Sequence, residues 1–122
     1  MSSWSSRPSQ AIDSSRASDA AAKSKMKGNP DPRLHAMDYL IYAYLQKGDD
    51  LQAKGIVNDL SFLPKAKQES LATAYAMAAI PARHAIERRR WAEALALSAN
   101  PSRYPYTEAI TYFTRAVGAA RS

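Results

Sequence analysis

The sequence contains no cysteine, and only four glycines and two histidines occur among its 122 residues. Without cysteine there is no disulfide framework, thiolate nucleophile, cysteine-ligated zinc site or iron–sulfur cluster. The four glycines are isolated from one another, so the chain has no glycine-rich loop of the kind that cradles phosphates. A chain of this length can bury a core as one domain without cross-links or metals.

Long apolar runs are also missing. The longest, residues 71–80, is well short of the roughly 20 residues that a membrane-spanning helix needs. The start of the chain, MSSWSSRPSQ, has neither the charged beginning nor the apolar centre of a secretory signal. We therefore expect a protein of the cytoplasm with no membrane contact.

Positive charge is in excess, with 17 Lys and Arg against 11 Asp and Glu, a net charge of +6 and a pI near 9.7. Such a bias can attract nucleic acid, anionic lipid or acidic proteins. The two basic clusters, residues 23–27 and 88–90, fall at the ends of predicted helices, where the helix dipole favours each cation by about 0.3–1 kcal/mol. Both therefore have a structural explanation. Nucleic-acid binding by ARHAIERRRW, with Trp91 beside the arginines, is a less favoured alternative.

Apolar residues recur at spacings of three and four along most of the chain, and no segment alternates with the period of a strand. The sequence therefore predicts an all-α fold. We expect residues 1–8, which are rich in serine, to be disordered or frayed, and residues 9–122 to form a single helical domain. The predicted helices cover about residues 9–26, 32–47, 49–62, 66–89, a short helix from 90, and 106–120.

Local signals mark the predicted helix ends and faces. Gly48 can adopt the left-handed conformation that ends a helix, and Asp49 can cap the next one. The apolar stripe of the fourth helix keeps its phase through Pro81, which predicts one kinked helix at a cost of about 3 kcal/mol. The residues expected to face the core are Ala11, Ile12, Ala17, Ala21; Leu34, Met37, Ile41, Tyr44, Leu45; Ala53, Ile56, Val57, Leu60; Leu71, Tyr75, Ala78, Ala82, Ala85; Trp91, Ala94, Leu95; and Tyr106, Ile110, Phe113, Val117.

Residues 37–64, MDYLIYAYLQKGDDLQAKGIVNDLSFLP, carry a recognisable pattern of large, small, aromatic and turn positions. Its positions are filled by Met37, Leu40, Ile41, Tyr44, Gly48, Ala53, Val57 and Pro64. The chain resembles the tetratricopeptide repeat family on these residues. Ile41 stands where the family prefers glycine or alanine, and Pro64 comes one place early. HAMDYLIYAYLQ and AAIPARHA are similar to later repeats of larger uncharacterised bacterial tetratricopeptide proteins.

The resemblance implies antiparallel helix hairpins in a right-handed superhelical stack of about six helices. A second unit follows 41 residues after the first, and residues 9–26 resemble the second helix of a preceding unit. A stack that starts on a half-repeat leaves a face uncovered. A self-associating, homodimerising fragment of a larger array is therefore the alternative to a binding scaffold.

In this family the first helix of each repeat lines a concave groove, so the resemblance implies a protein- or peptide-binding scaffold. The groove residues that it implies are Asp38, Tyr39, Tyr42 and Gln46, followed by Ala79, Ile80, Arg83 and Glu87. Asp38 and Tyr42 stand where the carboxylate clamp of the family needs Lys and Asn, so we do not expect that clamp. The alternative for Tyr39 and Tyr42 is packing against the flanking helix.

Candidate chemistry is sparse. His35 precedes Asp38, and His84 precedes Glu87, by three residues, so each pair lies on one helix face and could supply metal ligands or an oriented base. Local hydrogen bonding on solvated helix faces is the favoured explanation, since such two-residue pairs often arise by chance. No serine lies in a G-x-S-x-G or S-x-x-K context. We expect no enzyme activity, cofactor or metal, and keep a metal-dependent enzyme only as a less favoured alternative.

Overall fold

In the computed structural model, which describes residues 7–24, 30–63 and 69–122, every regular element is a helix. The all-α prediction is confirmed for those ranges. The elements are α1 Arg7–Ser24, α2 Asp31–Lys47, α3 Asp50–Asp59, a 3₁₀ turn η1 Leu60–Phe62, α4 Leu71–Glu87, α5 Trp91–Ala96 and α6 Pro105–Arg121. Predictions that concern residues 1–6, Lys25, Lys27 and Pro64 lie outside the described residues.

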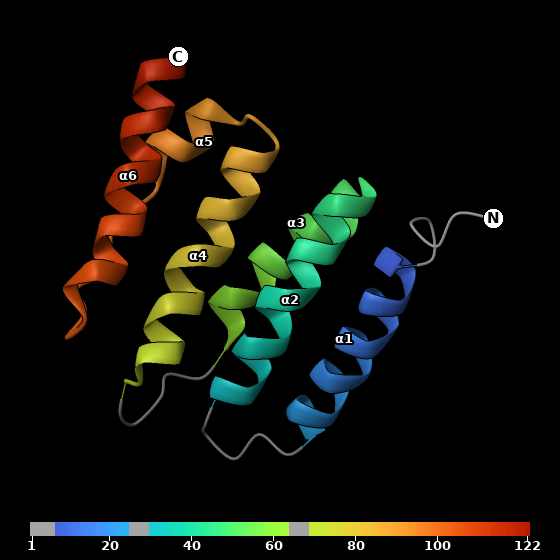
Figure 1. Ribbon diagram of the computed structural model, residues 1–122. Coiled ribbons are helices and arrows are strands. Elements are labelled where there is room, and N and C mark those ends of the chain that lie inside the picture. The colour runs from blue at the N-terminus through green and yellow to red at the C-terminus, as the bar shows by residue number, and fades with distance from the viewer. Residues whose placement is uncertain (1–6, 25–29, 64–68) are drawn as a thin grey trace.

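Four helices, α1, α2, α4 and α6, lie side by side in chain order (Figure 1). The shorter α3 packs against both α2 and α4, and α5 packs against both α4 and α6. Helix α2 has neighbours α1, α3 and α4, and α4 has neighbours α2, α3, α5 and α6, so these two helices lie at the centre of the packing. No described helix is both long enough and apolar enough to cross a lipid bilayer.

The helix ends follow the local signals of the sequence. Gly48 has φ +81°, the left-handed conformation that glycine adopts freely, and it ends α2. The Asp49 carboxylate accepts a hydrogen bond of 3.2 Å from the backbone N–H of Gln52 and so caps α3. Ser70 caps α4 in the same way through the N–H of Thr73. Helix α4 runs through Pro81 without a break, as the phase of its stripe predicted.

The core is built round α2. All five predicted inward residues of this helix are buried, as are Ala53 and Ile56 of α3. Ile12 of α1 and Ala76 and Ile80 of α4 complete the same cluster. Because residues three and four apart share one helix face, the spacing of α2 was sufficient to identify its buried side.

The predicted faces of the flanking helices are partly wrong. On α4, Leu71 and Tyr75 are exposed, whereas Ala76 and Ile80 are buried against α2. This helix has neighbours on two sides, and small side chains let the backbones come close, so its largest residues are not the innermost ones. On α1 Ala11, Ala17 and Ala21 are exposed, and on α5 Leu95 is exposed.

The face of α6 is also shifted by one position from the prediction. Tyr106 and Phe113 are 53% and 65% exposed, and the buried side is formed by Thr107, Thr111, Thr114 and Gly118. The physical reason lies at Gly118, where an added Cβ would stand 2.7 Å from the backbone N of Leu95. Close packing on α5 therefore requires the side of α6 that carries small residues.

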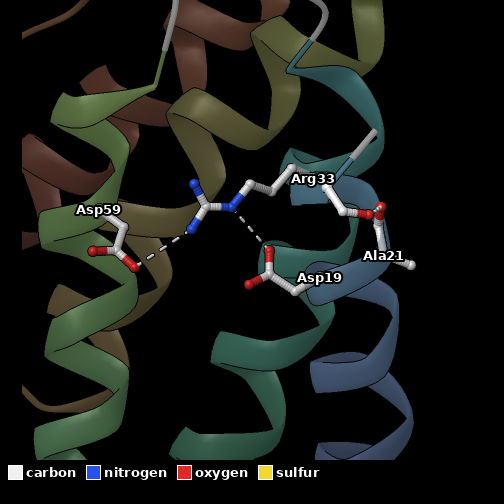
Figure 2. A network of polar contacts seen from close by, with 5 residues as sticks. Asp19, Ala21, Arg33 and Asp59 are labelled. Atoms are coloured by element: carbon white, nitrogen blue, oxygen red, sulfur yellow. Dashed lines mark hydrogen bonds and ion pairs between the residues drawn. The ribbon is translucent and has the colours of Figure 1, made fainter. Parts of the chain in front are cut away.

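One arginine links the first three helices (Figure 2). Arg33 of α2 donates from Nε to the Asp19 carboxylate of α1 at 3.1 Å, and its Nη2 lies 3.8 Å from the Asp59 carboxylate of α3. The side chains of Arg33 and Asp19 are mostly buried, so water screens the pair less than it would an ion pair in solvent. This network fixes α1 and α3 relative to the same face of α2.

The two helical glycines Gly118 and Gly55 give a direct test of this packing. Gly118→Ala should destabilise the fold by about 1–2 kcal/mol, because overpacking outweighs the gain in helix propensity. Gly55→Ala, inside α3 with nothing within 4 Å of the added Cβ, should stabilise it by about 0.5–1 kcal/mol. Urea unfolding of the three proteins measures both changes, and a Gly118→Ala protein as stable as Gly55→Ala would contradict the α5–α6 contact.

Candidate functional site

A cavity of about 480 Å³ lies between α2 and α4. It brings together four of the predicted groove residues, namely Asp38, Tyr39 and Tyr42 of α2 and Arg83 of α4. The remaining lining residues are His35 of α2 and Ala72, Tyr75 and Ala76 of α4. We call this cavity the aromatic groove.

The spacing of the α2 residues explains why they meet. His35, Asp38, Tyr39 and Tyr42 follow one another at intervals of three, one and three residues, which places them on one face of a helix. The other faces of α2 are buried against its neighbours. Opposite this strip, α4 presents Ala72 and Ala76, whose short side chains leave the space that the cavity occupies.

A fixed charge pair lies in the aromatic groove. Arg83 donates from Nη1 to Asp38 Oδ1 at 2.7 Å and to the backbone carbonyl of Asp38 at 3.3 Å. Its guanidinium carbon lies 5.6 Å from the centre of the Tyr42 ring, within the range of a cation–π contact. A charge-assisted hydrogen bond together with this contact holds the guanidinium in one orientation.

The aromatic walls of the groove are open to solvent. Tyr39 is 60% exposed and Tyr42 is 51% exposed, so neither ring is buried against a flanking helix. The His35 ring meets the Tyr39 ring edge-on, with centroids 4.9 Å apart and planes at 87°. Each ring therefore keeps a face or an edge available for a bound group.

The structure brings some of the predicted groove residues together at this cavity and separates others. Ala79 and Ile80, expected in the groove, are buried, because α4 turns this side toward α2. Gln46 and Glu87 are exposed and do not line the aromatic groove. Tyr75, which the sequence assigned to the core, lines this cavity. Its position four residues before Ala79 and eight before Arg83, both predicted groove residues, was the signal that could have shown this.

The two histidines lie in different surroundings. His35 lines the aromatic groove, whereas His84 is only 3% exposed and its Nδ1 lies 3.7 Å from Glu93 Oε2 of α5. Glu87, its expected partner, is exposed. Within residues 7–24, 30–63 and 69–122, no three His, Asp or Glu side chains cluster as metal ligands would.

Burial dominates the electrostatics of His84. Desolvation lowers the pKa of its imidazole below the ordinary value of 6.5, since the charged form loses its water. Lys54 of α3 and Arg90 lower this pKa further, whereas the carboxylates of Glu93 and Asp50 raise it. The side chain is therefore a neutral core residue near pH 7.

The arginine run 88–90 is largely engaged in structure. Arg88 donates to the backbone carbonyl of Leu45 at 2.8 Å and forms an ion pair with Asp50, which ties the end of α4 to the α2–α3 turn. Arg90 lies 3.5 Å from Glu93. Arg89 lines a smaller hollow of about 220 Å³ with Ile86, Trp91 and Arg121.

No protein-family model, curated protein or solved structure matches this chain. The functional interpretation therefore depends on the chemistry of the aromatic groove itself. That chemistry combines exposed tyrosine rings, a floor of alanines and a fixed pair of opposite charges. These groups can bind and orient another molecule through apolar, cation–π and hydrogen-bonding contacts.

The buried His84 predicts how stability depends on pH. Its folded pKa lies below 6.5, so just below pH 6.5 the unfolded chain binds more protons than the folded one. The free energy of unfolding should therefore fall as pH drops below about 6.5 and level off once the pH is below the lowered pKa. Urea unfolding at pH 5 to 8 should show a weaker fall for His84→Gln than for the wild-type protein.

His35→Gln, at the exposed histidine, is the matched control and should keep the wild-type dependence. An unchanged slope in His84→Gln would mean that this imidazole is not held in its neutral form by the fold.

Proposed function

We propose that this protein is a protein- or peptide-binding scaffold of the tetratricopeptide-repeat type and that the aromatic groove is its binding surface. The observation that carries the proposal is the cavity between α2 and α4. It joins exposed tyrosines to a fixed Arg83–Asp38 pair over an alanine floor. The groove has the volume of a ligand site, and it lies at a junction of two rigid helices.

The arrangement of the helices supports a repeat-type architecture. The α2–α3 turn is closed at Gly48, the turn position of the family pattern, and Asp49 caps the helix that follows. Helices α2, α4 and α6 alternate along the chain with the shorter α3 and α5, and α4 packs against both α2 and α6. We propose a right-handed stack of helix hairpins on this basis, with α1 as the half-unit before the first hairpin.

The chemistry of the aromatic groove favours peptide binding over catalysis. Tyrosine combines a large apolar ring with a hydroxyl and is enriched at the residues that dominate binding energy. The Asp38 carboxylate is held by Arg83, so it is a poor general base. The groups that remain can take an apolar side chain between the rings and hydrogen-bond a peptide backbone beside them.

Peptide selection tests the proposal without a known partner. A random peptide library is selected on the wild-type protein, and binding of the enriched peptides is measured by isothermal titration calorimetry. Tyr42→Ala should weaken binding about tenfold or more, equivalent to about 1.4 kcal/mol or more, because truncation removes both ring contact and the platform for Arg83.

Tyr112→Ala is the matched control, since Tyr112 is similarly exposed and also carries an arginine, Arg115, at 5.9 Å from its ring centre. It lies on α6, outside the aromatic groove, and should leave the affinity within about twofold. Peptides whose affinity is equal in the wild type and in Tyr42→Ala would refute the assignment of this groove.

Self-association is the second candidate function, and an apolar stripe on α6 favours it. The stripe consists of Tyr106 and Phe113, which are exposed, and of Ile110 and Val117, which are partly buried. Their spacing of four, three and four residues reads the same in both directions. Antiparallel pairing of two copies would thus set Tyr106 against Val117 and Ile110 against Phe113, as a two-fold interface requires.

Sedimentation velocity at concentrations from micromolar to near millimolar tests this second candidate. The wild-type protein should dimerise, Phe113→Asp should be monomeric because a charge in an apolar interface is desolvated, and Tyr112→Asp should still dimerise. A wild-type monomer at the highest concentration would eliminate self-association.

A further inference from the structure

A second cavity of about 480 Å³ lies between α4, the segment that follows α5, and α6. We call it the acidic cavity. Its α4 wall consists of Ala74, Met77, Ala78 and Pro81. These residues lie on the opposite side of the helix from Ala72, Ala76 and Arg83, because successive α-helical residues are turned by about 100°. The acidic cavity is therefore separate from the aromatic groove.

Two carboxylates meet at the acidic cavity and bind one short backbone segment. Glu69 accepts hydrogen bonds from the Ser102 hydroxyl at 2.9 Å and from the backbone N–H of Arg103 at 3.2 Å. Glu108 accepts through Oε2 from the backbone N–H of Ser102 at 3.3 Å. Both carboxylates are thus held in place by neutral donors, and neither is turned freely into solvent.

Neither carboxylate has a positive partner among the residues that the structure describes. The ion pairs of residues 7–24, 30–63 and 69–122 involve other carboxylates. Among the described residues, no Lys, Arg or His lines the acidic cavity, and the nearby Arg103 guanidinium stacks on Tyr104 at 5.8 Å instead. In a chain of net charge +6, the described part of this wall therefore carries two carboxylates and no cation.

A buried hydroxyl on α6 also lines the acidic cavity. Thr111 is only 6% exposed, yet its side chain makes no hydrogen bond to any described residue. Thr107 and Thr114, on the same side of α6, both donate to backbone carbonyls. Most hydroxyls of buried residues are hydrogen-bonded within the protein, so the Thr111 hydroxyl is available to a polar group that enters the acidic cavity.

The α4 wall adds a further acceptor and an apolar surface. Pro81 has no N–H, so it cannot donate to the carbonyl of Met77, four residues earlier. Met77, Ala78 and Pro81 themselves offer apolar contact. A hard metal ion prefers six or more oxygen ligands, which this largely apolar wall does not supply. A matching ligand has hydrogen-bond donors, positive charge and an apolar body.

We propose that the acidic cavity binds an organic cation, namely an ammonium or guanidinium group on an aliphatic chain. The cationic head lies between Glu69 and Glu108 with Thr111 as an additional partner, and the chain lies along Met77 and Pro81. A free amine and a Lys or Arg side chain of another protein carry this same chemistry. The proposal does not depend on peptide binding in the aromatic groove.

Chemical shifts of backbone amides in ¹⁵N-labelled full-length protein test this site. Three probes of equal chain length, hexylammonium, hexanol and hexanoate, are titrated against the wild-type protein. Hexylammonium should give saturable shifts at Ser102, Met77 and Thr111 and bind about tenfold or more tightly than either other probe, since hydrogen bonds to a charged group outweigh neutral ones. Equal affinities for hexylammonium and hexanol, or no saturable shift, would overturn the proposal.

Glu108→Gln tests the charge directly, because a glutamine oxygen can still accept from Ser102 and so preserve the segment. It should weaken hexylammonium binding about tenfold. Glu87→Gln, an exposed glutamate outside the acidic cavity, is the matched control and should leave the affinity within twofold. Thr111→Val, which keeps the volume and removes the hydroxyl, should weaken binding about threefold. A Glu108→Gln protein with wild-type affinity would refute the role of the carboxylates.

A blocked Gly-Lys-Gly peptide distinguishes the two sources of the cation. Binding at least as tight as that of hexylammonium supports a lysine of a partner protein as the occupant, and weaker binding supports a small free amine. Either result supports the cationic site, provided that a blocked Gly-Met-Gly peptide does not bind with equal affinity. Equal binding of the two peptides would overturn it.

Discussion

Burial of α2 on several sides is the constraint on which the rest of the structure depends. Its neighbours α1, α3 and α4 bury eight of its 17 residues, and Arg33 ties two of these neighbours to it through Asp19 and Asp59. The strip left open on this helix carries His35, Tyr39 and Tyr42. The core therefore decides which residues of α2 can meet a ligand, and the open strip is aromatic.

Small side chains on α4 explain why cavities form where they do. Close-packed helices leave few voids when large residues interdigitate. Here Ala72 and Ala76 line the aromatic groove on one side, and Ala74 and Ala78 line the acidic cavity on the other. These short side chains let α4 approach its neighbours closely, and they also leave cavities near the exposed edges of the helix. One helix thus provides walls for two sites of different charge.

The sequence predicted the parts of the fold in which size and periodicity agree. On α2 the large apolar residues are also the innermost ones, so their spacing identified the core, whereas Tyr39 and Tyr42 were assigned to the groove by the resemblance to the repeat family. On α4 and α6 the neighbouring helices come so close that Ala, Thr and Gly are buried, whereas Tyr75 and Phe113 are exposed. The spacing of apolar residues could not reveal these buried faces, because it depends on the hydrophobicity of each residue and not on the space between the packed helices. The acidic cavity depends on contacts more than 30 residues apart, such as Glu69 with Ser102.

The positions of the arginines change how the net positive charge should be interpreted. Arg33, Arg83 and Arg88 each bind a carboxylate, and two of them also bind backbone carbonyls of α2. Their charge is thus used to join helices, which reduces the potential they could present to a phosphate backbone. The local balance of charge, and not the sum of +6, then decides what each surface attracts. The aromatic groove holds a neutralised pair and favours apolar and hydrogen-bonded contacts, whereas the described lining of the acidic cavity holds Glu69 and Glu108 and no cation.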